Sequence, residues 1–73
     1  MTSDIKKFGK RIKNLRMMAD LSQEELSEKM GISREHLSLV ERGQRCLSLK
    51  KIFLLAHMLN IETYELFKFK KNS

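Results

Sequence analysis

The chain has 73 residues, enough for one domain, with 33% charged and 41% apolar residues and a formal net charge of +6. This composition excludes a disordered chain, and the longest apolar run, 52–56, is too short to cross a bilayer. The excess of Lys and Arg over Asp and Glu favours an anionic partner, either nucleic acid or a membrane surface, unless it serves only solubility.

The first predicted element is a helix over about residues 4–19. Its apolar residues recur at steps of three and four and fall on one narrow stripe, while most of its lysines and arginines face outward. Arg16 lies at the edge of this stripe, whose members are Ile5, Phe8, Ile12, Leu15 and Ala19. Because the chain has no proline, three glycines and no sustained alternation of period two, we expect helices throughout.

The second helix is predicted over residues 22–30. Ser22 and Glu25 have the spacing of a capping box, in which each side chain satisfies a free backbone N–H near the helix start. Gly31 suits the left-handed residue that follows a helix. Since only two residues separate this helix from the next N-cap, Ser33, the two helices must cross at a steep angle, as in a helix-turn-helix.

The third helix is predicted from Ser33 to about residue 42, before Gly43. Leu37 and Val40 point inward, and the opposite face carries Arg34, Glu35, Ser38, Leu39 and Arg42. Such a face suits the major groove, because Arg pairs with guanine, Glu accepts from cytosine, and an apolar group contacts the thymine methyl. A solvated face with an incidental leucine is the alternative.

The fourth helix is predicted over about residues 49–59, with Ser48 as N-cap and Asn60 as the left-handed residue at its end. A short fifth helix follows over about residues 63–67. The fourth helix is expected to bury one face in the core, which consists of Leu49, Ile52, Leu55, Ala56 and Leu59. We expect a single domain, 1–73, with a core over about 5–67 and a tail over 68–73.

Several apolar residues near the C-terminus exceed what one core face needs. They are Phe53, Leu54, Met58, Tyr64, Phe67 and Phe69. Apolar patches of this kind usually mark an interface, so we predict a homodimer seam over the fourth and fifth helices. The alternative is that the fifth helix and tail cover these residues within one chain.

The sequence contains no catalytic or metal-binding set. His36 and His57 are too few and too far apart for a zinc site, and Cys46 has no neighbouring His or Asn, so we interpret it as a packing residue. We expect a cytoplasmic protein that is not an enzyme and has no cofactor, metal or disulfide. We also expect that it binds neither a membrane nor a small-molecule substrate. The methionines expected to fill gaps in the core are Met17, Met18, Met30 and Met58.

One long segment resembles a known family. Residues 21–34, LSQEELSEKMGISR, followed by Leu37 and by Val-Glu-Arg-Gly over 40–43, are similar to the lambda-repressor-like (Cro/repressor, XRE-type) helix-turn-helix family. The resemblance extends over about residues 8–67. It implies a compact all-α domain of five helices, in which the second and third form the helix-turn-helix.

The resemblance also implies roles for individual side chains. The third helix enters the major groove, which makes Arg34, Glu35, Ser38 and Leu39 the expected base contacts. The expected contacts to the phosphate backbone are Gln23, Ser33, Arg42, Gln44 and Arg45, and His36 at the edge of the helix is added to them. The family pairs an arginine of the first helix with a glutamate of the third, so Arg16 and Glu41 are expected to form a partly buried ion pair.

The chain departs from the family at three places. Cys46-Leu47 replaces an Asn-Pro pair, and the resulting stretch 45–49, RCLSL, is similar to the controller proteins of restriction–modification systems. Leu39 stands where a long polar residue is common, which removes one hydrogen-bonding base contact. Glu35 is acidic on a face that approaches phosphates, so it must meet a cytosine or orient Arg34.

These observations predict a sequence-specific transcriptional regulator that binds double-stranded DNA as a homodimer. Two third helices would enter major grooves about 34 Å apart on a pseudo-palindromic operator. A controller of a restriction–modification operon is one form of this prediction. The alternative is a protein-interaction module, such as an antitoxin, that uses its apolar fourth-helix surface to bind a different protein.

Overall fold

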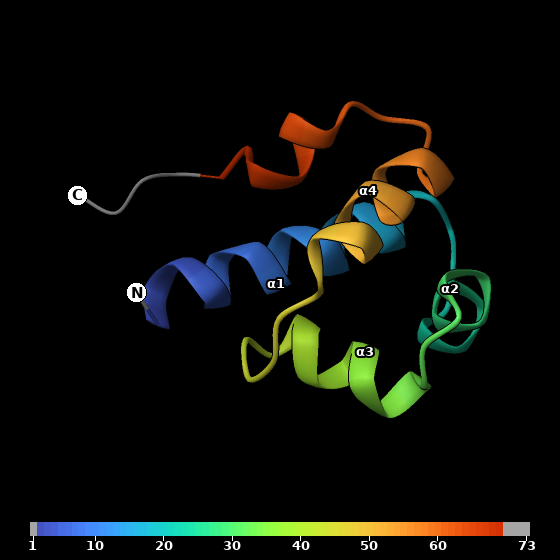
Figure 1. Ribbon diagram of the computed structural model, residues 1–73, viewed down its shortest axis with the longest axis horizontal. Helices are drawn as coiled ribbons and strands as arrows, with labels where there is room; N and C mark the ends of the chain where they lie inside the picture. Colours follow the sequence, from blue (N-terminus) through green and yellow to red (C-terminus); the bar gives the residue numbers. More distant parts are fainter. Residues whose placement is uncertain (1, 70–73) are drawn as a thin grey trace.

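The protein is all-helical. The computed structural model describes residues 2–69, and within that range it contains four α-helices, one 3₁₀ helix and no strand (Figure 1). The elements are α1 (Thr2–Met18), α2 (Gln23–Met30), α3 (Arg34–Glu41), α4 (Leu49–Met58) and η1 (Thr63–Phe67). The five predicted helices are confirmed, although the fifth is a single 3₁₀ segment. Residues 70–73 of the predicted tail lie outside the described residues.

Helix α1 runs through the middle of the molecule, between α3 and η1. In Figure 1, α3 lies below α1 and η1 lies above it, and both contact α1. Helix α2 packs against α3 and α4, and α4 packs against η1. No helix of the described part is long and apolar enough to span a bilayer.

Serines begin three of the helices, as predicted. The hydroxyl oxygens of Ser22, Ser33 and Ser48 each accept a hydrogen bond from a backbone N–H three residues on, over 3.0, 2.9 and 3.2 Å. Ser22 and Glu25 complete the capping box, because the Ser22 backbone N–H donates to Glu25 Oε1 over 2.8 Å. These bonds satisfy donors that the helix itself leaves free.

Left-handed residues end the helices where the sequence predicted them. Gly31, Gly43 and Asn60 have φ angles of 71°, 77° and 58°. Asp20 also has a positive φ, 62°, in the turn between α1 and α2, and no sequence signal indicated it.

The core consists of apolar side chains from every element. Ile12, Leu26, Leu37, Val40, Leu55 and Leu66 are fully buried, and Phe8, Met30, Leu47 and Ala56 join them. The predicted inward direction of Leu37 and Val40 on the third helix is therefore confirmed.

Four residues predicted to be buried are not. Ala19 lies beyond the end of α1 and is exposed. Met17 and Met18 are 57% and 78% exposed, because at about 100° per residue Met17 falls opposite the apolar stripe of α1, and Met18 falls beside the stripe at the last residue of the helix. Leu49 is 65% exposed, because it occupies the first turn of α4, before the helix reaches the core.

Helix α1 approaches α3 closely at Gly9. A Cβ atom at this position would overlap the carbonyl oxygens of Val40 and Glu41. Only glycine therefore permits this separation, which sets the distance between α1 and the end of α3. The sequence analysis assigned no role to Gly9.

Candidate nucleic-acid interface

The turn between α2 and α3 fixes how α3 leaves the body of the molecule. Gly31 adopts the left-handed conformation, and the Ile32 N–H donates to the Ser27 carbonyl over 3.0 Å. Ser33 then caps α3. The Lys51 ammonium donates to the Met30 carbonyl over 2.7 Å, which places a positive charge at the C-terminal end of α2, where the helix dipole favours it.

The start of α3 presents polar side chains to solvent. Arg34 and Glu35 are exposed, whereas Leu37 and Val40 are fully buried beneath them. Ser38 and Leu39 are half-buried, so they offer less surface than the first two residues. The four predicted base-contact residues thus lie on the outward side of α3, with Arg34 and Glu35 the most accessible.

The six residues predicted to contact the DNA backbone differ in how exposed they are. Ser33, Arg42, Gln44 and Arg45 are exposed, whereas Gln23 and His36 are half-buried. His36 Nε2 is buried and has no hydrogen-bond partner among the described residues, so this atom reaches a phosphate only if the ring turns. A cavity of about 430 Å³ beside it is lined by Ser33, Glu35, His36, Leu39 and Arg45.

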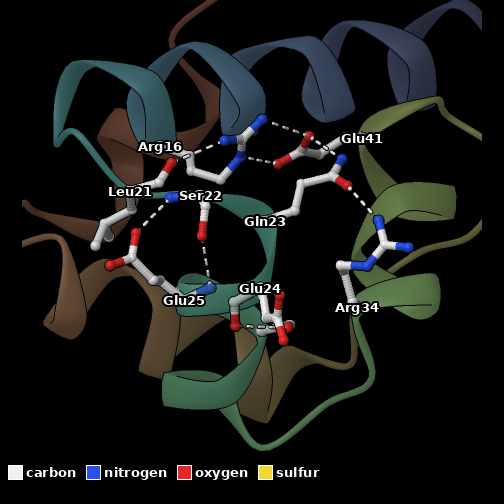
Figure 2. Close-up of polar contacts among 9 residues, drawn as sticks. Arg16, Leu21, Ser22, Gln23, Glu24, Glu25, Arg34 and Glu41 are labelled. Carbon is white, nitrogen blue, oxygen red and sulfur yellow. Dashed lines mark hydrogen bonds and ion pairs between the residues drawn. The ribbon is translucent and has the colours of Figure 1, made fainter.

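A buried ion pair fixes α3 against α1. Arg16 Nε donates to Glu41 Oε2 over 2.7 Å, and Arg16 Nη2 donates to Oε1 over 3.2 Å (Figure 2). The two residues are only 9% and 7% exposed. Arg16 Nη1 also donates to the Leu21 carbonyl over 2.8 Å, so most of the donors that face the protein are satisfied.

Gln23 extends this network to the surface. Its Nε2 donates to Glu41 Oε1 over 2.9 Å, and its Oε1 accepts from Arg34 Nη1 over 3.5 Å (Figure 2). The first side chain of α2 thereby contacts both the last and the first residue of α3. The family resemblance predicted the pairing of Arg16 with Glu41, but nothing connected Gln23 to Glu41 or to Arg34, because no local pattern reports a contact between residues 18 positions apart.

Hydrogen bonding changes the acidity of one residue beside this face. The Ser22 backbone N–H and hydroxyl hold the pKa of Glu25 below the usual value of a glutamate, and Lys29 adds a smaller lowering effect. Glu25 therefore carries a negative charge at the N-terminal end of α2, where the helix dipole favours it.

The other notable surface is apolar and lies over α4 and η1. Phe53, Tyr64 and Phe67 of the predicted dimer seam are 53%, 64% and 47% exposed, and Leu49 adds to them. Leu54 is half-buried. Met58 and Phe69 are partly buried against the core, so these two offer less free surface than the sequence analysis expected.

A groove opens beside this apolar surface. It has a volume of about 610 Å³, and its lining is mostly apolar: Asp4, Ile5, Phe8, Cys46, Leu47, Ile52, Phe67 and Phe69. The rings of Phe8 and Phe67 stack with their centroids 5.0 Å apart. Cys46 is exposed, so the interpretation of this residue as a packing residue is wrong; the loop between α3 and α4 turns its side chain outward.

Two further observations concern charged side chains. Arg11 holds η1 onto α1: its Nε donates to the Glu65 carbonyl over 2.9 Å, and its Nη2 lies 3.6 Å from Glu65 Oε1. No local sequence pattern indicated this contact.

Among residues 2–69, no group of three or more His, Cys, Asp or Glu side chains is arranged to hold a metal ion.

The sequence and the fold of this chain are similar to those of known proteins. The family model described as Helix-turn-helix matches residues 12–66. The solved restriction-modification controller protein C.AhdI from Aeromonas hydrophila is 48% identical, with 89% of this chain and 98% of that chain covered and a TM-score of 0.84. The control protein C.SmaI from Serratia marcescens is 36% identical over 58 residues, 78% of this chain and 69% of the relative.

A third comparison concerns a relative solved with nucleic acid. The biofilm regulator SinR, crystallised in complex with DNA, is 29% identical to this chain. The match covers 84% of this chain and 98% of that chain, with a TM-score of 0.76.

Proposed function

This chain belongs to the helix-turn-helix family of DNA-binding transcriptional regulators, and we propose that it binds a specific double-stranded operator as a homodimer. Its similarity to C.AhdI and C.SmaI supports a more specific role, the control of a restriction–modification operon. We propose no catalytic step for the chain, and we propose the cytoplasm as its location.

The observation that carries the proposal is the polar, outward face at the start of α3. Arg34 and Glu35 are exposed above the buried Leu37 and Val40, so α3 enters a groove without unfolding any part of the core. Arg34 pairs with guanine O6 and N7, and Glu35 accepts from a cytosine amino group. These two side chains, with Ser38 and Leu39, choose the sequence.

Contacts to phosphates position α3 and supply most of the affinity. Ser33, Gln44 and Arg45 are exposed around the start and end of α3, and the chain has a net charge of +6. Each neutralised phosphate releases counterions, so the association constant falls steeply as salt rises. Arg42 at the C-terminal end of α3 adds to this set.

The homodimer follows from the limited reading length of a single α3. One helix contacts too few base pairs to select a site in a genome, and a two-fold axis doubles that number on a palindromic operator. Phe53, Tyr64 and Phe67 supply an exposed apolar surface on α4 and η1 for the seam. Leu54, Met58 and Phe69 support it from partly buried positions.

The experiment begins with selection of duplexes from random DNA by the full-length protein. Dissociation constants are then measured for the selected duplex and for a scrambled one. We expect Arg34→Ala to weaken the selected duplex by roughly tenfold or more and the scrambled duplex little. Lys13→Ala removes an exposed charge of α1 and should weaken both duplexes equally and modestly. Equal weakening of both duplexes by both variants would exclude sequence reading through α3.

A further inference from the structure

A basic cavity lies on the side of α1 away from α3, next to the segment that follows η1 (Figure 1). At 3.6 residues per turn, Lys7 and Arg11 project about 160° around α1 from Gly9, the residue that touches α3. The cavity has a volume of about 280 Å³, and no acidic side chain of the described residues lines it. Its lining consists of four cations, an amide and an aromatic ring: Lys7, Lys10, Arg11, Lys68, Asn14 and Phe69.

The fold uses only one of these four positive charges. Arg11 is engaged with Glu65 through a hydrogen bond and an ion pair. Within residues 2–69, none of the three lysines of the cavity forms an ion pair. Lys7 precedes Lys10 by three residues and Arg11 by four, which are the spacings at which like charges on a helix repel each other. An anion bound in the cavity would remove this repulsion.

The lining indicates the chemistry of that anion. Ammonium groups bind phosphate oxygens through charge-assisted hydrogen bonds, and three unpaired ones match the charge of two or three phosphate groups. The ring of Phe69 offers a face on which a base can stack, and the Asn14 amide can both donate and accept a hydrogen bond. The volume is just below the range of about 300–1,000 Å³ for pockets that enclose a drug-sized ligand, so part of a nucleotide would stay in solvent.

We propose that this cavity binds a nucleoside di- or triphosphate, with the phosphates on Lys7, Lys10 and Lys68 and the base against Phe69. This inference goes beyond the proposed function, which involves no small molecule. A duplex read by α3 lies on the other side of α1, so the cations of the cavity stay free while DNA is bound.

The cavity also stays open in the proposed homodimer. Phe69 lines both this cavity and the apolar groove that contains Phe67. Burying unpaired ammonium groups in a dimer seam is unfavourable, because each loses its hydration without gaining a partner. The seam is therefore expected to use the groove side of Phe69 and to leave the basic side exposed.

The test is isothermal titration calorimetry of the full-length protein at about 0.15 M salt, where charges more than about 8 Å apart are largely screened. The probes are ATP, inorganic triphosphate and adenosine. We expect ATP to bind roughly fivefold or more tightly than triphosphate, because only ATP has a base to stack. Adenosine, which lacks the phosphates, should give no measurable heat.

Two double variants separate the cavity from the net charge. Lys7→Gln, Lys10→Gln should weaken ATP binding roughly tenfold or more. Lys6→Gln, Lys13→Gln is the matched control, because it removes the same charge from the same helix outside the cavity. It should change the dissociation constant for ATP by no more than about twofold.

Phe69→Leu tests the contact with the base. Leucine keeps an apolar side chain against the core, where Phe69 is partly buried, but has no ring. The affinity of this variant for ATP should fall to that for triphosphate. An unchanged preference for ATP would contradict the proposed place of the base.

Three results would overturn the inference. One is triphosphate binding as tightly as ATP to the wild type, and another is an equal loss in the two double variants, since both indicate general attraction to a chain of net charge +6. The third is exclusion of ATP by the selected operator duplex, which would make these lysines DNA contacts. If the protein binds no duplex, the proposed function fails, but the titration of the free protein still decides the nucleotide site.

Discussion

The two exposed faces of this protein are built in opposite ways. At the start of α3, the exposed side chains are polar, and one of them, Arg34, is joined through Gln23 to the buried ion pair of Arg16 and Glu41. On α4 and η1, the exposed side chains are apolar, and an open groove of about 610 Å³ lies beside them. The polar face is hydrated and needs no partner, whereas the apolar face becomes more stable when another surface covers it.

This comparison separates recognition from assembly. Arg34 and Glu35 are exposed, as are Phe53 and Tyr64, but water hydrogen-bonds to the charged groups of the first two and not to the aromatic rings of the other two. Removing the internal support of the α3 face should therefore affect folding and base reading. Changing the α4 face should affect association and leave the fold intact.

The largest expected effect comes from the ion pair behind α3. Glu41→Ala leaves the Arg16 guanidinium buried without its partner and should lower the free energy of unfolding by about 3–5 kcal/mol. Urea denaturation followed by circular dichroism measures this change. Glu65→Ala is the control, because its contact with Arg11 is partly exposed and should contribute no more than about 1 kcal/mol.

An apolar replacement sharpens the same prediction. The double variant Arg16→Met, Glu41→Leu removes both charges and should recover most of the stability that Glu41→Ala loses. If the single variant loses less than the Glu65 control, Arg16 and Glu41 are not a buried pair in solution.

A smaller loss is expected where α1 meets α3. On helix propensity alone, Gly9→Ala would stabilise α1 by about 1 kcal/mol. The added Cβ overlaps the backbone of α3, however, so we expect a net destabilisation of about 3 kcal/mol. Thermal denaturation decides the sign. Asn14→Ala, at an exposed site on the same helix, is the control and should stabilise slightly.

The helices and turns were largely predictable from sequence because their causes are local. Ser22, Ser33 and Ser48 lie next to the backbone N–H groups that they cap, and Gly31 ends its own helix. The outward direction of Arg34 follows from the period of α3 and from the burial of its opposite face. Composition and spacing carry this information directly.

The contacts between elements were not predictable in the same way. Gly9, Gln23 and Arg11 act through partners distant in sequence, Val40, Glu41 and Glu65. Their roles depend on the distance and angle between helices, which a single sequence does not specify. The exposure of Leu49 was missed for the same reason, since the first turn of α4 lies before the helix reaches the core. The exposure of Met17 and Met18, in contrast, follows from the period of α1 and was predictable from the sequence.

The apolar face should determine the oligomeric state. Phe53 is half-exposed on α4, and Phe53→Ser should raise the dimer dissociation constant by the equivalent of about 2 kcal/mol, with little change in the fold. Analytical ultracentrifugation over a range of concentrations measures this shift. Met18→Ser, at a more exposed apolar site on α1, is the matched control and should leave the dimer unchanged.

Two results would break the comparison at this face. A monomeric wild type would mean that the apolar surface does not form a homodimer seam. A stable one-to-one complex with a different small protein, lost in Phe53→Ser, would support the interaction-module alternative instead.

The smallest effect concerns the capping box at the start of α2, beside Gln23. The Ser22 backbone N–H lowers the pKa of Glu25 in the folded protein below its value in the unfolded chain. The unfolded chain therefore binds this proton more readily than the folded one as the pH falls. The contribution of the charged carboxylate is fully present above the unfolded pKa and disappears as the pH falls through the folded pKa.

Glu25→Gln keeps a side-chain acceptor for the Ser22 N–H but cannot titrate. We expect the melting temperature of the wild type to fall more steeply than that of Glu25→Gln between about pH 6 and pH 3. Thermal denaturation at steps of pH, in one buffer of constant ionic strength, measures both slopes. Equal slopes would mean that Glu25 does not cap α2 in solution. The hydrogen bonds that reach Arg34 would then start at Gln23, with no contribution from the capping box of Ser22 and Glu25.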